Sequence, residues 1–178
     1  MGMGKQEALD LALATKEVFT HLDRVVLKNR ERVEPREAWF RLLHEDPGSI
    51  AWVHPALEDF LRHEYDRLVL PREMSCVTSH GEQYPRHSLI STRFDRWQAS
   101  ATLRPLWFGT DFDQNLARHL QLLQQEGILN IFFYLDVGQS WQVAFTPALL
   151  QHGFQPFAIF PYFGEGDVVL FHFQGGRS

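Results

Sequence analysis

The chain has 178 residues, of which 44% are hydrophobic and 13% aromatic, and this predicts one domain over residues 1–178 with one substantial core. The net charge of −5 is mild and the 17 basic residues are scattered, so we expect no nucleic-acid partner. The single cysteine, Cys76, excludes an internal disulfide. The sequence has neither an apolar stretch that would span a bilayer nor a charged-then-apolar leader, so we expect a cytoplasmic protein with no membrane partner.

Residues 1–71 have a helical pattern. Apolar residues recur every three or four positions from Ala8 to Val26 and mark one face of a long helix. A second helix is predicted over 34–43, with Pro35 in its first turn, and a third over 54–70. We expect these helices to pack on or beside a sheet, because their apolar stripes are too wide to face water. The same segment is the expected surface for a protein partner or for a second copy of the chain.

Residues 72–178 change to a strand-rich pattern with short connections. The nearly unbroken apolar run 131–137 lies between two helical segments and is typical of a strand buried on both faces. We therefore expect it to pair in parallel with strand 97–106 through a right-handed crossover helix. The fold class is α/β (α+β), a mixed sheet with a central parallel β-α-β pair and a C-terminal hairpin. The predicted elements are strands 88–94 and 97–106 in a hairpin, helix 115–126, strand 131–137, helix 140–152 and a final hairpin of 154–163 with 168–173.

The order of elements from Ser88 to Gln174 resembles the C-terminal two-thirds of the GNAT acyltransferase superfamily. In that family the strands on either side of the crossover helix splay apart, and acyl-coenzyme A lies in the gap with its pyrophosphate on N–H groups at the helix start. The resemblance implies a GNAT-like core over residues 72–178, with acetyl-CoA or another acyl-CoA between the strands ending at Leu106 and Val137. It also implies transfer of the acyl group to an amine by positioning and by polarisation of the thioester carbonyl.

The loop that would hold the coenzyme departs from the family pattern Gln/Arg-x-x-Gly-x-Gly/Ala. It has one glycine, and its carboxylates, Asp111 and Asp113, would repel a pyrophosphate. Leu149 stands where many members carry a catalytic tyrosine. The alternative reading of Asp111 is a helix N-cap in a capping box with Gln114. The coenzyme-binding residues that the resemblance implies are Trp107, Phe108, Gly109, Thr110 and Asp111.

Three residues are candidates for acid–base chemistry. Asp136 lies at the carboxyl end of strand 131–137, where ligands of α/β sheets bind, and it would act as general base if desolvation raised its pKa. The alternative is a structural role at the strand end beside Gly138. Glu82 and His87 belong to a loop that lines the acceptor pocket in the GNAT arrangement. The loop contains ligand types for zinc, but its spacing matches no metal motif, so we expect no metal.

Two functions from different classes follow from these patterns. The first is an acyl-CoA-dependent N-acyltransferase, in which Trp107 and Phe108 receive the acyl chain or the pantetheine arm. The second is a non-catalytic GNAT-like scaffold that binds a protein partner or a metabolite through its helical N-terminal segment or the altered crevice. The alternative role of Trp107 and Phe108 is to seal a crevice that no longer binds a ligand. The order of elements favours the first function, and the acidic, glycine-poor loop favours the second.

Overall fold

A computed structural model of the chain describes residues 46–77 and 84–174. The residues from Asp46 onward form one compact unit. The helices predicted over 8–26 and 34–43 and the candidate residue Glu82 lie outside the described residues, so a single domain over the whole chain stays a prediction. Among the described residues, no helix combines the length and apolarity needed to cross a membrane.

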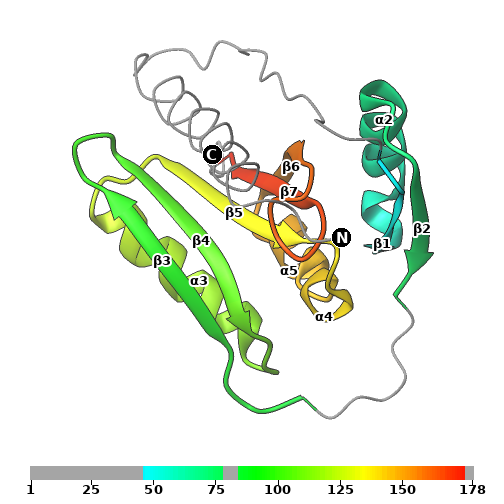
Figure 1. Cartoon of the computed structure of the whole chain (residues 1–178). Helices are drawn as coiled ribbons and strands as arrows, with labels where there is room; N and C mark the ends of the chain where they lie inside the picture. The colour runs from blue at the N-terminus through cyan, green and yellow to red at the C-terminus, as the bar shows by residue number, and fades with distance from the viewer. Residues whose placement is uncertain (1–45, 78–83, 175–178) are drawn as a thin grey trace, which may run out of the picture. The chain divides into compact units, whose positions relative to one another are not determined.

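The first described elements form a small α/β unit (Figure 1). Strand β1 (Ser49–Val53) is followed by the 3₁₀ turn η1 (Pro55–Leu57), helix α2 (Glu58–Leu68) and strand β2 (Arg72–Cys76), and β1 pairs with β2 in parallel. Helix α2 confirms the third predicted helix. Strand β1 corrects the expectation that residues 1–71 are helical. Pro47 and Gly48, the latter at φ +81°, stand directly before it and disfavour a helix there.

The remaining strands form a five-stranded sheet in the order β3-β4-β5-β7-β6 (Figure 1). Strands β4 and β5 are parallel and joined through helix α3 (Phe112–Gln125), which confirms the predicted crossover, and the other neighbours are antiparallel. The predicted C-terminal hairpin is β6 with β7. The strands are β3 (Leu89–Asp95), β4 (Ser100–Trp107), β5 (Asn130–Asp136), β6 (Phe154–Phe160) and β7 (Val168–Phe173).

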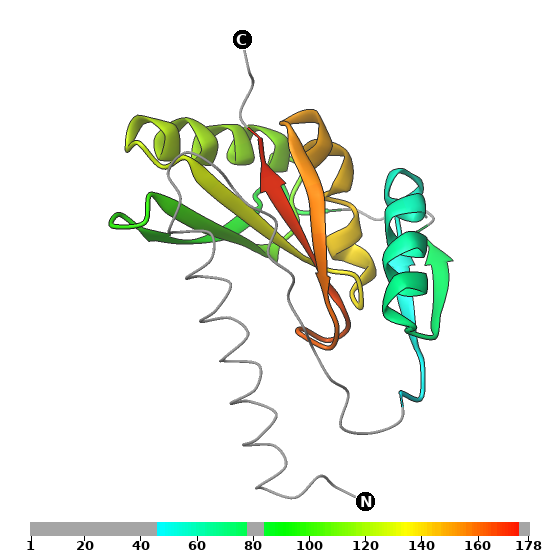
Figure 2. The ribbon, with the colours of Figure 1, turned by 90° about the horizontal axis from the view of Figure 1, so that it is seen from above.

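Helix α3 and the short helices α4 (Ser140–Val143) and α5 (Thr146–Gln151) lie against one face of this sheet (Figure 2). The single helix predicted over 140–152 is two short helices in the structure. Pro147 has no N–H to donate, so the helical hydrogen bonding does not continue through this point. Fully buried Phe133 and Phe145 pack between sheet and helices, with ring centroids 6.2 Å apart. The core thus lies on the helix side of the sheet.

The hairpin between β3 and β4 has a longer turn than predicted. The carboxylate of Asp95 accepts hydrogen bonds from the N–H groups of Trp97 and Gln98, at 2.9 and 3.2 Å, and holds the turn closed. Strand β4 consequently begins at Ser100, three residues later than predicted, and the side chain of Trp97 is 95% exposed.

Main-chain hydrogen bonds join the small unit to the end of β5. The N–H of Trp52 in β1 donates to the carbonyl of Val137 at 2.8 Å, and the N–H of Val137 donates to the carbonyl of Asp167 at 2.9 Å. Three segments that are far apart in the sequence therefore meet at the carboxyl end of β5. This is the part of the molecule where the candidate site lies.

Candidate functional site

The parallel strands β4 and β5 pair over only part of their length. Residues Ser100–Leu103 are in register with Asn130–Phe133, and the last residues of both strands have no register partner across the pair. A bulge lies at this point of β4, because Leu89 of β3 pairs with Trp107 while the next residue pairs with Pro105. Leu106 is the extra residue of this bulge, and bulges bend a strand away from its neighbour. The sheet therefore opens between the ends of β4 and β5.

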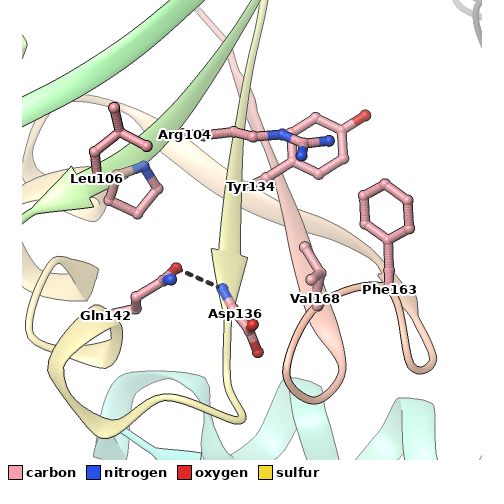
Figure 3. A pocket seen from close by; sticks show the side chains of 9 residues that line it. Arg104, Leu106, Tyr134, Asp136, Gln142, Phe163 and Val168 are labelled. Atoms are coloured by element: carbon pink, nitrogen blue, oxygen red, sulfur yellow. Dashed lines mark hydrogen bonds between the residues drawn. The ribbon is translucent and has the colours of Figure 1, made fainter.

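A cavity of about 140 Å³ occupies this opening (Figure 3). The guanidinium of Arg104 lies over the ring of Tyr134, 4.8 Å from its centroid, and 5.3 Å from the ring centroid of Phe163. Both polar and apolar side chains line the cavity, which is typical of a small-molecule site. Its lining residues are Arg104, Pro105, Leu106, Tyr134, Asp136, Gln142, Phe163, Gly164 and Val168.

The predicted base Asp136 is 6% exposed, and its carboxylate is heavily hydrogen-bonded. One carboxylate oxygen accepts from the N–H groups of Gly138 and Gly166, at 2.9 and 3.1 Å. The other accepts from the N–H of Glu165 at 2.7 Å and from the side-chain amide of Gln139 at 3.3 Å. The carboxylate therefore connects the end of β5 to the loop between β6 and β7. The hydrogen bond from Gly138 agrees with the alternative interpretation of the sequence, in which Asp136 has a structural role at the end of the strand.

A second, larger cavity of about 320 Å³ lies beside the first. It contains the predicted residues Trp107 and Phe108, and the ring of Phe108 packs 4.5 Å from Tyr84 and 4.9 Å from Phe145, measured between centroids. Leu106 lines both cavities. The lining of the second cavity is mainly aromatic and apolar: Tyr84, Pro85, Leu106, Trp107, Phe108 and Trp141.

The loop before α3 is already bonded to another segment of the chain. The N–H of Thr110 donates to the carbonyl of Pro85 at 2.9 Å, and the N–H of Asp111 donates to the carbonyl of Arg86 at 3.1 Å. A Cβ added at Gly109 would lie 2.2 Å from a main-chain carbon of the same segment. These contacts satisfy two of the N–H groups that the GNAT resemblance assigns to a pyrophosphate. A pyrophosphate at this loop would have to displace these two hydrogen bonds.

The carboxylate of Asp111 turns toward the same segment. It accepts a hydrogen bond of 2.6 Å from the N–H of Ser88 and lies 3.1 Å from Nδ1 of His87. Hydrogen bonds from Ser88, followed by those from His87, lower the pKa of Asp111 to about 2. Asp111 is the N-cap residue of α3, but its side chain makes no capping hydrogen bond. The predicted capping box with Gln114 is therefore wrong, because the carboxylate accepts from the N–H of Ser88 instead.

The second acidic residue of the loop has a different partner. Oδ1 of Asp113 lies 2.9 Å from Nε2 of His152, at the end of α5. The two carboxylates, which the sequence suggested as obstacles to a coenzyme, are therefore both occupied in contacts within the chain. Among the described residues, no group of three His, Cys, Asp or Glu side chains is placed to hold a metal ion.

The predicted site residues fall into three places. Asp136 lines the smaller cavity, and Trp107 and Phe108 line the larger one. His87 is exposed and joins Asp111 at the start of α3, together with Gly109 and Thr110. Glu82 lies outside the described residues.

Sequence reasoning missed Arg104, Gln142 and Phe163 as lining residues of the smaller cavity. A signal for Arg104 was present, since it is the one charged residue in the eight residues of β4. Phe163 gave no such signal, because it reaches the cavity from a loop that follows β6. Comparison with protein-family models, curated proteins and solved structures gives no match to this chain.

Proposed function

We propose that this chain is a GNAT-like protein that binds an acyl thioester between β4 and β5 and transfers the acyl group to an amine. The observation that carries the proposal is the end of the β4–β5 register at Leu103 and Phe133, with a bulge at Leu106 just beyond it. Such an opening exposes strand backbone to an extended ligand, which can pair with it as another strand would. The acyl donor and the amine are the substrates.

The two cavities divide the ligands of this reaction. The larger, aromatic-lined cavity suits the apolar arm of a thioester, and the smaller one, which has both polar and apolar lining, receives the substrate that carries the amine. In this proposal the reacting atoms lie at Leu106, which lines both cavities, and a main-chain N–H of the bulge polarises the thioester carbonyl. Rate enhancement then comes mainly from positioning.

The amine nitrogen attacks the carbonyl carbon, so that a C–N bond forms and the C–S bond breaks. The proton that the amine loses passes through water to the departing thiolate. We assign no proton transfer to Asp136, because four donors already engage its carboxylate. The general-base role that the sequence predicts for Asp136 is therefore no part of the proposed reaction.

The nucleotide of coenzyme A contributes little in this proposal. The N–H groups of Thr110 and Asp111 already donate to carbonyls of the chain, so a pyrophosphate would have to displace them. The donor is therefore recognised through its thioester arm. Acetyl-CoA and S-acetylpantetheine, which lacks the nucleotide, should bind with affinities within about threefold of each other, a difference of about 0.7 kcal/mol.

Isothermal titration calorimetry tests the proposal with acetyl-CoA, octanoyl-CoA, free coenzyme A and S-acetylpantetheine. Micromolar binding of the thioesters, roughly −8 kcal/mol, supports it. Trp107→Ala should weaken that binding at least tenfold, because Trp107 lines the larger cavity. Trp97→Ala is the matched control, since this tryptophan is 95% exposed in the β3–β4 turn. Failure of every thioester to bind would reject the acyltransferase function.

The alternative function is a non-catalytic scaffold that binds a metabolite in the same opening. The observation that favours it is the covered loop before α3, where Ser88 and Asp111 are bonded to each other at 2.6 Å. The double variant Asp111→Asn, Asp113→Asn separates the two functions. If the wild type does not bind acyl-CoA but the double variant does, the chain has the scaffold of a transferase with its donor site closed by its own carboxylates.

A further inference from the structure

Arg104 has no ion-pair partner among the described residues. The ion pairs of residues 46–77 and 84–174 involve the arginines Arg62, Arg67, Arg72 and Arg96, and Arg104 is in none of them. Its guanidinium instead lies against two aromatic rings, those of Tyr134 and Phe163. An exposed cation at a cavity wall, with no ion-pair partner in the part of the chain that the structure describes, is open to an anionic ligand.

The two aromatic contacts hold the guanidinium of Arg104 at the wall of the cavity. The guanidinium carbon lies 4.8 Å from the ring centroid of Tyr134 and 5.3 Å from that of Phe163, and an arginine that stacks on aromatic rings can still offer N–H groups at its edge to a ligand. Figure 3 shows the side chain of Arg104 reaching from β4 across to the ring of Tyr134 on β5. A planar fork of donors held in this way matches a carboxylate, which accepts two parallel hydrogen bonds.

We propose that the smaller cavity binds a small carboxylate-bearing molecule through Arg104, and that the acyl acceptor is therefore an amino acid or a similar amine with a carboxylate. The second part rests on the proposed function. Arg104 and Leu106 line the same cavity of about 140 Å³, so a ligand anchored at Arg104 places its amine near the bulge. The size of the cavity suits a single amino acid, since drug-sized ligands occupy roughly 300 Å³ or more.

Calorimetry on the full chain without any coenzyme tests the carboxylate site. The probes are L-leucine, L-methionine, L-phenylalanine and L-glutamate, each compared with its own α-amide, which keeps the amine and lacks the carboxylate. At least one of the acids should bind ten times more tightly than its amide. Absence of such a preference in all four pairs would overturn the proposal, and so would equally tight binding of inorganic phosphate.

Variants of Arg104 show whether this residue supplies the preference. Arg104→Gln should weaken binding of the preferred acid at least tenfold, and Arg104→Lys should weaken it less because the charge remains. Arg93→Gln is the matched control, since Arg93 is an exposed arginine on the neighbouring strand β3. It should stay within twofold of the wild type. An unchanged affinity in Arg104→Gln, with its fold verified by circular dichroism, would overturn the proposal.

Binding of the thioesters, measured separately, distinguishes this inference from the proposed function. Amino-acid binding without thioester binding rejects the acyltransferase function and leaves the carboxylate site standing. Thioester binding with no preference for acids over amides rejects the carboxylate site alone.

Discussion

Leu103 of β4 and Phe133 of β5 are the last residues in register between the two central strands, and both side chains are fully buried. The next residues of the two strands, Arg104 and Tyr134, meet through the guanidinium and the ring at 4.8 Å. Main-chain pairing between β4 and β5 thus ends at Leu103 and Phe133, and at the next residue of each strand the contact is between side chains. The opening between the strands is consequently supported by the core and does not depend on a loop.

The buried ion pairs of Arg72 should contribute strongly to stability. Its guanidinium lies 2.7 Å from a carboxylate oxygen of Asp167 and 2.7 Å from one of Asp46, and its side chain is 1% exposed. Arg72→Ala leaves two buried carboxylates without their partner, which should lower the free energy of unfolding by about 3–5 kcal/mol. Urea unfolding measures this. The control Arg62→Ala removes an exposed pair with Glu58 and should cost less than about 1 kcal/mol; equal losses in both variants would contradict this account.

The pH dependence of stability should reflect Asp111. Its pKa in the folded protein is about 2, mainly because Ser88 donates to it, and lies below the value of 3.8 expected for an unpaired aspartate. Between about pH 4 and pH 2 the unfolded state therefore binds more protons, so this contribution is complete above pH 4 and is lost as the pH falls through 2. Carbon-13 NMR titration of the Asp111 carboxyl should give a midpoint near 2. A midpoint near 4 would show that the bond to Ser88 is absent in solution.

Gly164 should be intolerant of a side chain, because a Cβ there would lie 2.2 Å from a carboxylate oxygen of Asp136. Gly164→Ala forces that carboxylate away from its donors in the β6–β7 loop and should lower the free energy of unfolding by about 1–3 kcal/mol. The neighbouring Glu165→Ala keeps the N–H that donates to Asp136 and should change it by less than about 0.5 kcal/mol. Thermal and urea unfolding of both variants check the difference, and an undisturbed Gly164→Ala would contradict the anchoring role of Asp136.

The central sheet was predictable because its signals are local. The apolar run 131–137 and the positive-φ glycines Gly127 and Gly153 mark a buried strand and the ends of two helical segments, and the structure has these features where the sequence predicts them. Pro147 was also a local signal for the break between α4 and α5, but the prediction of one helix over 140–152 rested on its two ends alone. A proline inside a predicted helix marks a place where the helical hydrogen bonding can break.

The candidate site was less predictable, because its contacts join residues far apart in the sequence. Asp111 and its donor Ser88 are separated by 23 residues, and Arg72 and Asp167 by 95. A carboxylate at a helix start favours a capping interpretation unless a distant donor competes, and the sequence gives no sign of that donor. The sequence predicts Gly109 as part of a phosphate-binding loop. In the structure, the missing side chain instead leaves room for the main chain of His87 and Ser88.

The affinity of S-acetylpantetheine for the Leu106→Trp variant is the most direct test of thioester binding between β4 and β5. Leu106 is 53% exposed and lines both cavities, so a larger side chain there obstructs the opening without entering the core. The control is Leu122→Trp, a similarly exposed position at 60% on α3. We predict at least a tenfold loss of affinity in Leu106→Trp and less than a twofold change in Leu122→Trp. Undiminished binding by Leu106→Trp would place the thioester elsewhere and contradict the account.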